Sequence, residues 1–101
     1  MNLKEICQEL LSVMEGLQEG TVLFTYDNLA SAMKYGHPVE ILDDVMAEFV
    51  LGVMDGKEQD QKTVENVLKG LKRFKRSFKV KELGKPIKDL TTYLSEMDSN
   101  T

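Results

Sequence analysis

Apolar residues recur at intervals of three and four along most of this chain, which is the spacing of one face of an α-helix. The first stripe predicts an amphipathic helix over 2–18 that ends at Gly20, since glycine adopts the left-handed conformation common at helix C-termini. Its apolar positions are Leu3, Ile6, Cys7, Leu10, Val13, Met14 and Leu17.

A short second helix is predicted over 27–36, where Thr25 or Asp27 can act as the N-cap. Its apolar positions Leu29, Ala30 and Met33 are expected to point into the core.

The third helix is predicted over 38–54, because proline is favoured in the first turn of a helix and Asp55-Gly56 ends the pattern. Apolar residues lie on most of its circumference, which is typical of a central helix. Its acids form one narrow strip: Glu40, Asp43, Asp44 and Glu48.

Two more helices are predicted in the C-terminal part. Thr63 can cap the fourth, whose apolar face consists of Val64, Val67, Leu68, Leu71, Phe74 and Phe78. The fifth is predicted over 86–97, with Ile87, Leu90, Tyr93, Leu94 and Met97 directed inward.

The segments 22–26 and 78–82 are rich in β-branched and aromatic residues or alternate in polarity, so each could be a short strand. The fold class expected is therefore all-α, a compact bundle of four to five short helices, with a minor two-stranded element left open. At 101 residues we expect a single helical domain over 1–97 and a frayed tail over 98–101.

Charge is distributed unevenly behind the modest net value of −4. Residues 1–60 contain three basic and twelve acidic side chains, a net charge of −9, whereas residues 61–101 contain ten basic and five acidic ones, a net charge of +5. The two parts could attract each other within the fold, or each could face a partner of opposite sign.

Recognisable catalytic, cofactor or metal-binding motifs are absent from the sequence. His37 stands alone in a turn, and Cys7 lies on an apolar stripe, where a buried and unreactive thiol is expected. In the stretch 55–60 the third and fifth places of a calcium loop hold Lys57 and Gln59, and the sixth holds Asp60 instead of the required glycine. We therefore expect a non-enzymatic protein with no catalytic, cofactor or metal residues.

A single cysteine, no apolar run of about 20 residues and no pattern of a signal peptide favour a cytoplasmic protein without a membrane partner.

The segment 69–81, KGLKRFKRSFKVK, contains seven basic residues and two phenylalanines. Phe74 and Phe78 continue the apolar spacing of the fourth helix, so they are expected in the core and not as platforms for stacked bases. The basic residues occupy the remaining arc and are the main candidates for partner binding: Lys69, Lys72, Arg73, Lys75, Arg76 and Lys79. The acidic residues Glu40, Asp44 and Glu48 are the second candidate surface.

The stretch 25–46, TYDNLASAMKYGHPVEILDDVM, resembles the helix-turn-helix of winged-helix regulators. The resemblance implies that the helix over 38–54 would be the recognition helix in the major groove. That helix contains no Lys or Arg and four acids, so contact with phosphates would be repulsive.

These features favour a small adaptor, regulator or inhibitor that acts by protein–protein contact through a charged helical face. The alternative is a nucleic-acid-associated regulator that uses the basic segment 69–81. A homodimer is also expected, since the third helix carries more apolar surface than four short neighbouring helices can cover.

Overall fold

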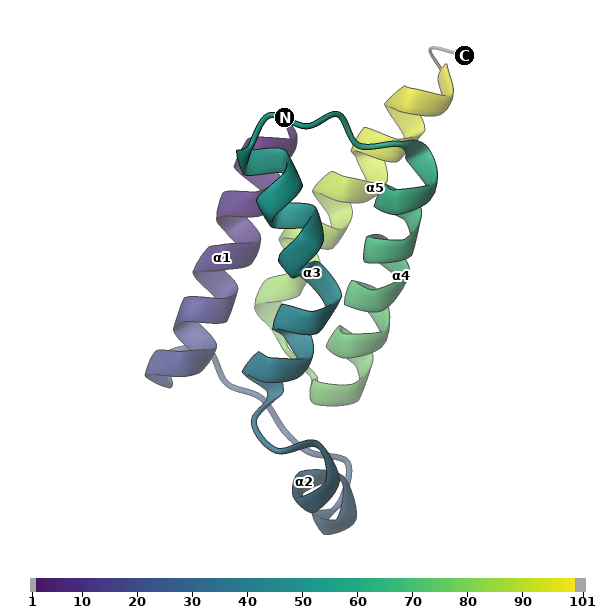
Figure 1. Cartoon of the computed structure of the whole chain (residues 1–101). Helices are drawn as coiled ribbons and strands as arrows, with labels where there is room; N and C mark the ends of the chain where they lie inside the picture. The colour runs from purple at the N-terminus through teal and green to yellow at the C-terminus, as the bar shows by residue number, and fades with distance from the viewer. Residues whose placement is uncertain (1, 100–101) are drawn as a thin grey trace.

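The computed structural model describes residues 2–99 and contains no strand within them (Figure 1). Its helices are α1 (Leu3–Glu19), α2 (Leu29–Tyr35), α3 (Pro38–Met54), α4 (Gln61–Phe78), the 3-10 turn η1 (Lys81–Leu83) and α5 (Gly84–Ser99). The all-α fold with five helices is thus confirmed. The last helix includes residues 98 and 99 of the predicted tail, and residues 100–101 lie outside the described residues.

Four long helices form the bundle: α1 packs against α3 and α5, and α4 packs against α3 and α5. The short helix α2 lies beyond one end of this bundle (Figure 1), which makes the molecule elongated, with extents of 46 × 21 × 19 Å.

Asn and Asp side chains cap three helices by accepting a hydrogen bond from the backbone N–H three residues later. Asn2 accepts from Glu5, Asn28 from Ser31 and Asp60 from Thr63, at donor–acceptor distances of 2.9, 2.8 and 2.7 Å. The predicted caps of α2 and α4 were therefore wrong. The Thr63 N–H donates the hydrogen bond to the capping Asp60, and the Thr63 side chain does not cap α4.

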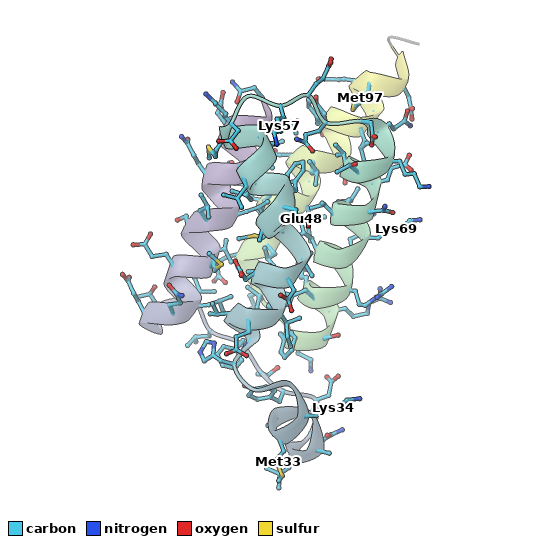
Figure 2. The ribbon with its side chains drawn as sticks, viewed as in Figure 1. Met33, Lys34, Glu48, Lys57, Lys69 and Met97 are labelled. Atoms are coloured by element: carbon cyan, nitrogen blue, oxygen red, sulfur yellow. The ribbon has the colours of Figure 1, made fainter. Side chains whose placement is uncertain are left out.

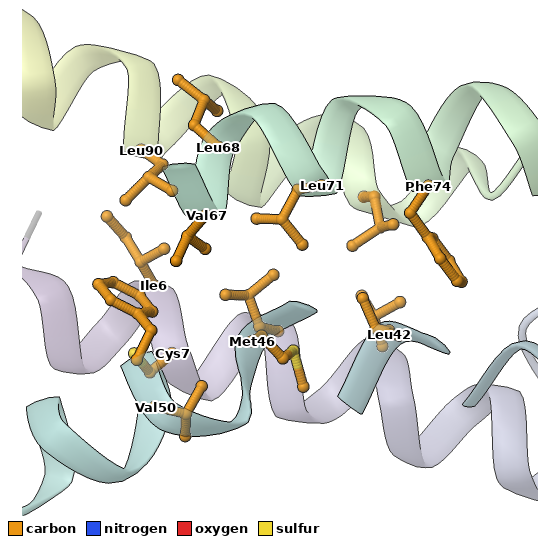
Figure 3. Packing of buried hydrophobic residues seen from close by; sticks show 14 of the residues in the cluster. Ile6, Cys7, Leu42, Met46, Val50, Val67, Leu68, Leu71, Phe74 and Leu90 are labelled. Atoms are coloured by element: carbon orange, nitrogen blue, oxygen red, sulfur yellow. The ribbon is translucent and has the colours of Figure 1, made fainter. Parts of the chain in front are cut away.

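The core consists of side chains from α1, α3, α4, α5 and the η1 region, and Figure 3 shows α3 and α4 contributing facing residues such as Met46 and Leu71. Phe74 and Phe78 are 3% and 5% exposed, which confirms that they are core residues. The Cys7 thiol is buried in the same cluster, and desolvation raises its pKa to about 11.

Most of the apolar surface of α3 is covered within the chain. Its buried residues Leu42, Met46, Phe49, Val50 and Val53 face the core, where α3 contacts both α1 and α4. Leu51 is the large apolar residue that α3 leaves most exposed. The homodimer stays a prediction, for which α3 offers Leu51 and Met54 as exposed apolar residues.

The two predicted strand segments do not pair as strands. One backbone hydrogen bond joins them, from the Thr25 N–H to the Phe78 carbonyl at 2.9 Å. Phe78 still belongs to α4, Lys79 then turns the chain in a left-handed conformation, and Lys81–Leu83 form the 3-10 turn. Val80 and Leu83, the apolar residues at the two ends of this turn, are both buried.

The inward orientation predicted for α2 was wrong, because Leu29 is 75% and Met33 is 80% exposed. The segment that carries α2 is instead attached through rings at its base, where Tyr26 packs edge-on against Phe24 and Phe78 at centroid distances of 5.4 and 5.9 Å. The helix α2 has only seven residues. Because these ring contacts lie before its first residue, they hold the segment in place without covering Leu29 and Met33 of the helix itself.

Replacing Lys79 by glycine is expected to raise the free energy of unfolding by about 0.5–1 kcal/mol, measured by urea unfolding. Lys79 has a φ of 54° at the C-terminus of α4, a conformation that glycine adopts without the steric cost of a Cβ. Lys79→Ala removes the same charge but retains the Cβ, so it should show no such gain. Equal stabilities of the two variants would contradict this interpretation.

Candidate interaction surfaces on helix α4

The cations of α4 form an exposed arc opposite its buried face. At about 100° per residue, Lys69 lies on the outward ridge of the helix, whereas Arg73 is turned toward α3 and Lys72 toward α5. Lys69, Lys72, Arg73, Arg76 and Lys79 are exposed, and Lys75 is half-buried. Figure 2 shows Lys69 projecting from the outer side of α4.

The groove between α4 and α5 is strongly basic. It has a volume of about 480 Å³ and is lined by Lys72, Lys75, Arg76 and Lys88 together with Gly84 and Ile87. No acidic residue is among these lining residues. Four cations from two helices therefore converge on one open surface.

The groove on the other side of α4 has a different character. This cavity of about 340 Å³ has an apolar floor that includes Ile41, Val45 and Phe74, and Arg73 and Asp27 lie at its polar rim. The basic arc predicted from the sequence is thus divided: Lys72, Lys75 and Arg76 belong to the α5 side, and Arg73 belongs to the α3 side.

None of the six candidate cations, five on α4 and Lys79 at its C-cap, is in an ion pair with another residue of the described range 2–99. The contrast is Lys85 on α5, which pairs with Glu9 of α1 and lies 3.6 Å from Asp89. The hydrogen bond to Glu9 is the main cause that raises the pKa of Lys85. Among the residues 2–99, ion pairs therefore form around Lys85 and not at the six candidate cations.

The acidic residues Glu40, Asp44 and Glu48 are exposed on α3 and likewise have no ion-pair partner among the described residues. Glu48 lies on the face of α3 that is visible beside α4 in Figure 2. The charges of α3 and α4 thus lie on neighbouring helices without neutralising one another.

Lys88 is the groove residue that sequence reasoning missed. It belongs to the polar face of α5, and no motif marks it as different from other surface lysines. Only the packing of α5 beside α4 places it opposite Lys72 and Arg76.

The remaining chemistry of the described residues is limited. The exposed His37 caps α3, because its Nδ1 accepts a hydrogen bond from the Val39 N–H at 3.2 Å, and its ring packs edge-on against Phe24. Within 2–99 no three His, Cys, Asp or Glu side chains gather as metal ligands would. None of the helices described combines the length and the apolar character that crossing a membrane would require.

No family model, no curated protein and no solved structure matches this chain.

Proposed function

We propose that this protein is a small protein-binding module, an adaptor, regulator or inhibitor, that holds an acidic segment of a partner protein in the groove between α4 and α5. The observation that carries the proposal is the convergence of Lys72, Lys75, Arg76 and Lys88 on one groove without an acid among its lining residues.

Carboxylates of a partner would find both charge and hydrogen-bond donors in this groove. Arg76 can bind a carboxylate through two parallel N–H donors, and the lysines contribute mobile point charges beside it. Such a surface speeds association with an acidic partner and makes binding sensitive to salt. The aliphatic stems of the lysines and the half-buried Ile87 provide apolar contact beneath the charges.

Protein is favoured over nucleic acid as the partner on two grounds. If α2 and α3 acted as the helix-turn-helix that their sequence resembles, the exposed acids Glu40, Asp44 and Glu48 would face phosphates, which would be repulsive. Phe74 and Phe78 are buried, so the basic segment 69–81 lacks exposed aromatic side chains on which bases could stack.

The test is the charge reversal Lys72→Glu/Arg76→Glu/Lys88→Glu. The partner is first isolated on the wild-type protein from an extract of the source organism, and its affinity for purified variants is then measured by calorimetry. We expect binding to fall at least tenfold, while the far-ultraviolet circular dichroism stays unchanged, because all three residues are exposed and surface substitutions typically change stability by about 0.5 kcal/mol or less.

The matched control is Lys4→Glu/Lys57→Glu/Lys81→Glu, which gives the same net charge through exposed residues outside the groove. If the groove variant and this control bind the partner with the same affinity, the proposal is contradicted. Salt-sensitive binding of random duplex DNA by the wild type, lost in the groove variant, would instead support the nucleic-acid alternative.

A further inference from the structure

The face formed jointly by α3 and α4 carries opposite charges on its two helices. Asp44 and Glu48 lie on the α3 half, and Lys69 and Arg73 lie on the α4 half, all exposed. The cavity between the helices is lined by Ile41 and Val45 from α3 and by Arg73 from α4, so Arg73 borders the shared face.

The charges of the two halves lie at matching heights along the bundle. A Cβ built on Gly70 would lie 2.8 Å from Val45 Cγ1, so these two residues mark the same level of the antiparallel helices. With a rise of about 1.5 Å per residue, Asp44 and Glu48 lie within about 5 Å of that level, as do Lys69 and Arg73.

From this arrangement we infer that the α3–α4 face binds a second copy of this chain. A two-fold axis parallel to the helices and lying in the interface places α3 of each copy over α4 of the other. Such an axis changes no residue's height, so Asp44 and Glu48 of one copy meet Lys69 and Arg73 of its partner, and the same contacts recur on the other side of the axis.

Charge complementarity selects a second copy as the occupant. These four residues have no ion pair among the residues of 2–99, although they belong to adjacent helices. A symmetric dimer satisfies all of them at once. The alternative two-fold axis, perpendicular to the helices, would place acids over acids and is excluded by repulsion.

The interface is small and charged, so the dimer is weak and salt-sensitive. Leu51, which is 65% exposed on the outer side of α3, adds an apolar contact near the acidic strip. The dimer leaves the groove between α4 and α5 open, so the inference stands independently of the proposed function.

A charge-swap experiment tests the inference by sedimentation velocity at protein concentrations up to about 1 mM, the range of weak association. We expect the wild type to dimerise at about 0.01 M salt, where the screening length is about 30 Å, and to dissociate at about 1 M salt, where it is about 3 Å. Asp44→Lys/Glu48→Lys and Lys69→Glu/Arg73→Glu should each weaken self-association at least tenfold, because both halves of the face then carry one sign.

An equimolar mixture of the two variants should form a heterodimer, because every contact across the axis is again attractive. Glu5→Lys/Glu15→Lys, which reverses two exposed acids of α1, is the control and should dimerise like the wild type. A wild type that stays monomeric at low salt, a dimer that persists at about 1 M salt, or a mixture that stays monomeric would each overturn the inference. Circular dichroism of each variant establishes that it is folded, and none of the four reversed residues of the α3–α4 face lines the basic groove.

Discussion

Replacing Phe49 by alanine is expected to lower the free energy of unfolding by about 3–5 kcal/mol. Phe49 is 3% exposed on the inner face of α3, the helix that packs against both α1 and α4. Truncation removes the buried ring and leaves a cavity that the neighbouring helices can close only in part. The loss is a large fraction of the stability of a typical domain, about 5–15 kcal/mol, so the variant is expected to be partly unfolded at moderate temperature. Urea unfolding followed by circular dichroism measures the change.

The matched control is Leu51→Ala on the same helix, where the side chain is 65% exposed. It should cost about 0.5 kcal/mol or less, as is typical of surface substitutions. A cost below about 1 kcal/mol for Phe49→Ala would show that the ring is not part of the core.

The second large effect is expected at Gly70 of α4, which faces Val45 of α3. In an isolated helix, alanine in place of glycine would stabilise by about 1 kcal/mol. At Gly70, however, the new Cβ would lie 2.8 Å from Val45 Cγ1, and the short branched side chain of valine has little freedom to move away. We expect overpacking to outweigh propensity, with a net loss of about 1–2 kcal/mol for Gly70→Ala.

A double-mutant cycle separates the two contributions. In a Val45→Ala background the obstructing methyl groups are absent, so Gly70→Ala should become stabilising by about 0.5–1 kcal/mol. Thermal or urea unfolding of the four proteins measures the coupling. If Gly70→Ala changes the free energy of unfolding equally in both backgrounds, a clash with Val45 is not the reason for the loss of stability.

Helix positions were largely predictable because each long helix carries its own apolar period and end signals. The stripe from Leu3 to Leu17 needs one buried side, and Gly20 ends α1 in the left-handed conformation, with a φ of 82°. Pro38 begins α3 as predicted. These are local properties of the sequence, and the tertiary structure agrees with them. The exact caps of α2 and α4 were missed, since several neighbouring residues could accept the hydrogen bond and the periodic pattern does not distinguish among them.

The orientation of α2 and the conformation of the segments near residues 24 and 79 depended on long-range contacts. Leu29 and Met33 carry the spacing of a buried face, yet they are 75% and 80% exposed, and the rings of Phe24 and Tyr26 attach the segment at its base. Phe78 and Val80 alternate with lysines as strand residues do, but Phe78 ends α4 and Val80 is buried where the 3-10 turn begins. Periodicity identifies which residues are apolar and cannot identify what is available to cover them.

The candidate site divides in the same way. The sequence by itself determined that α4 has one apolar and one basic side, since the spacing of Val64 to Phe78 leaves the cations no other place. Only the tertiary structure decided that these cations lack ion-pair partners within the described chain, that Lys88 of α5 joins them, and that Arg73 faces α3 instead. The physical reason is that helix periodicity specifies directions around one axis, whereas a binding surface depends on which helices lie side by side and at what height.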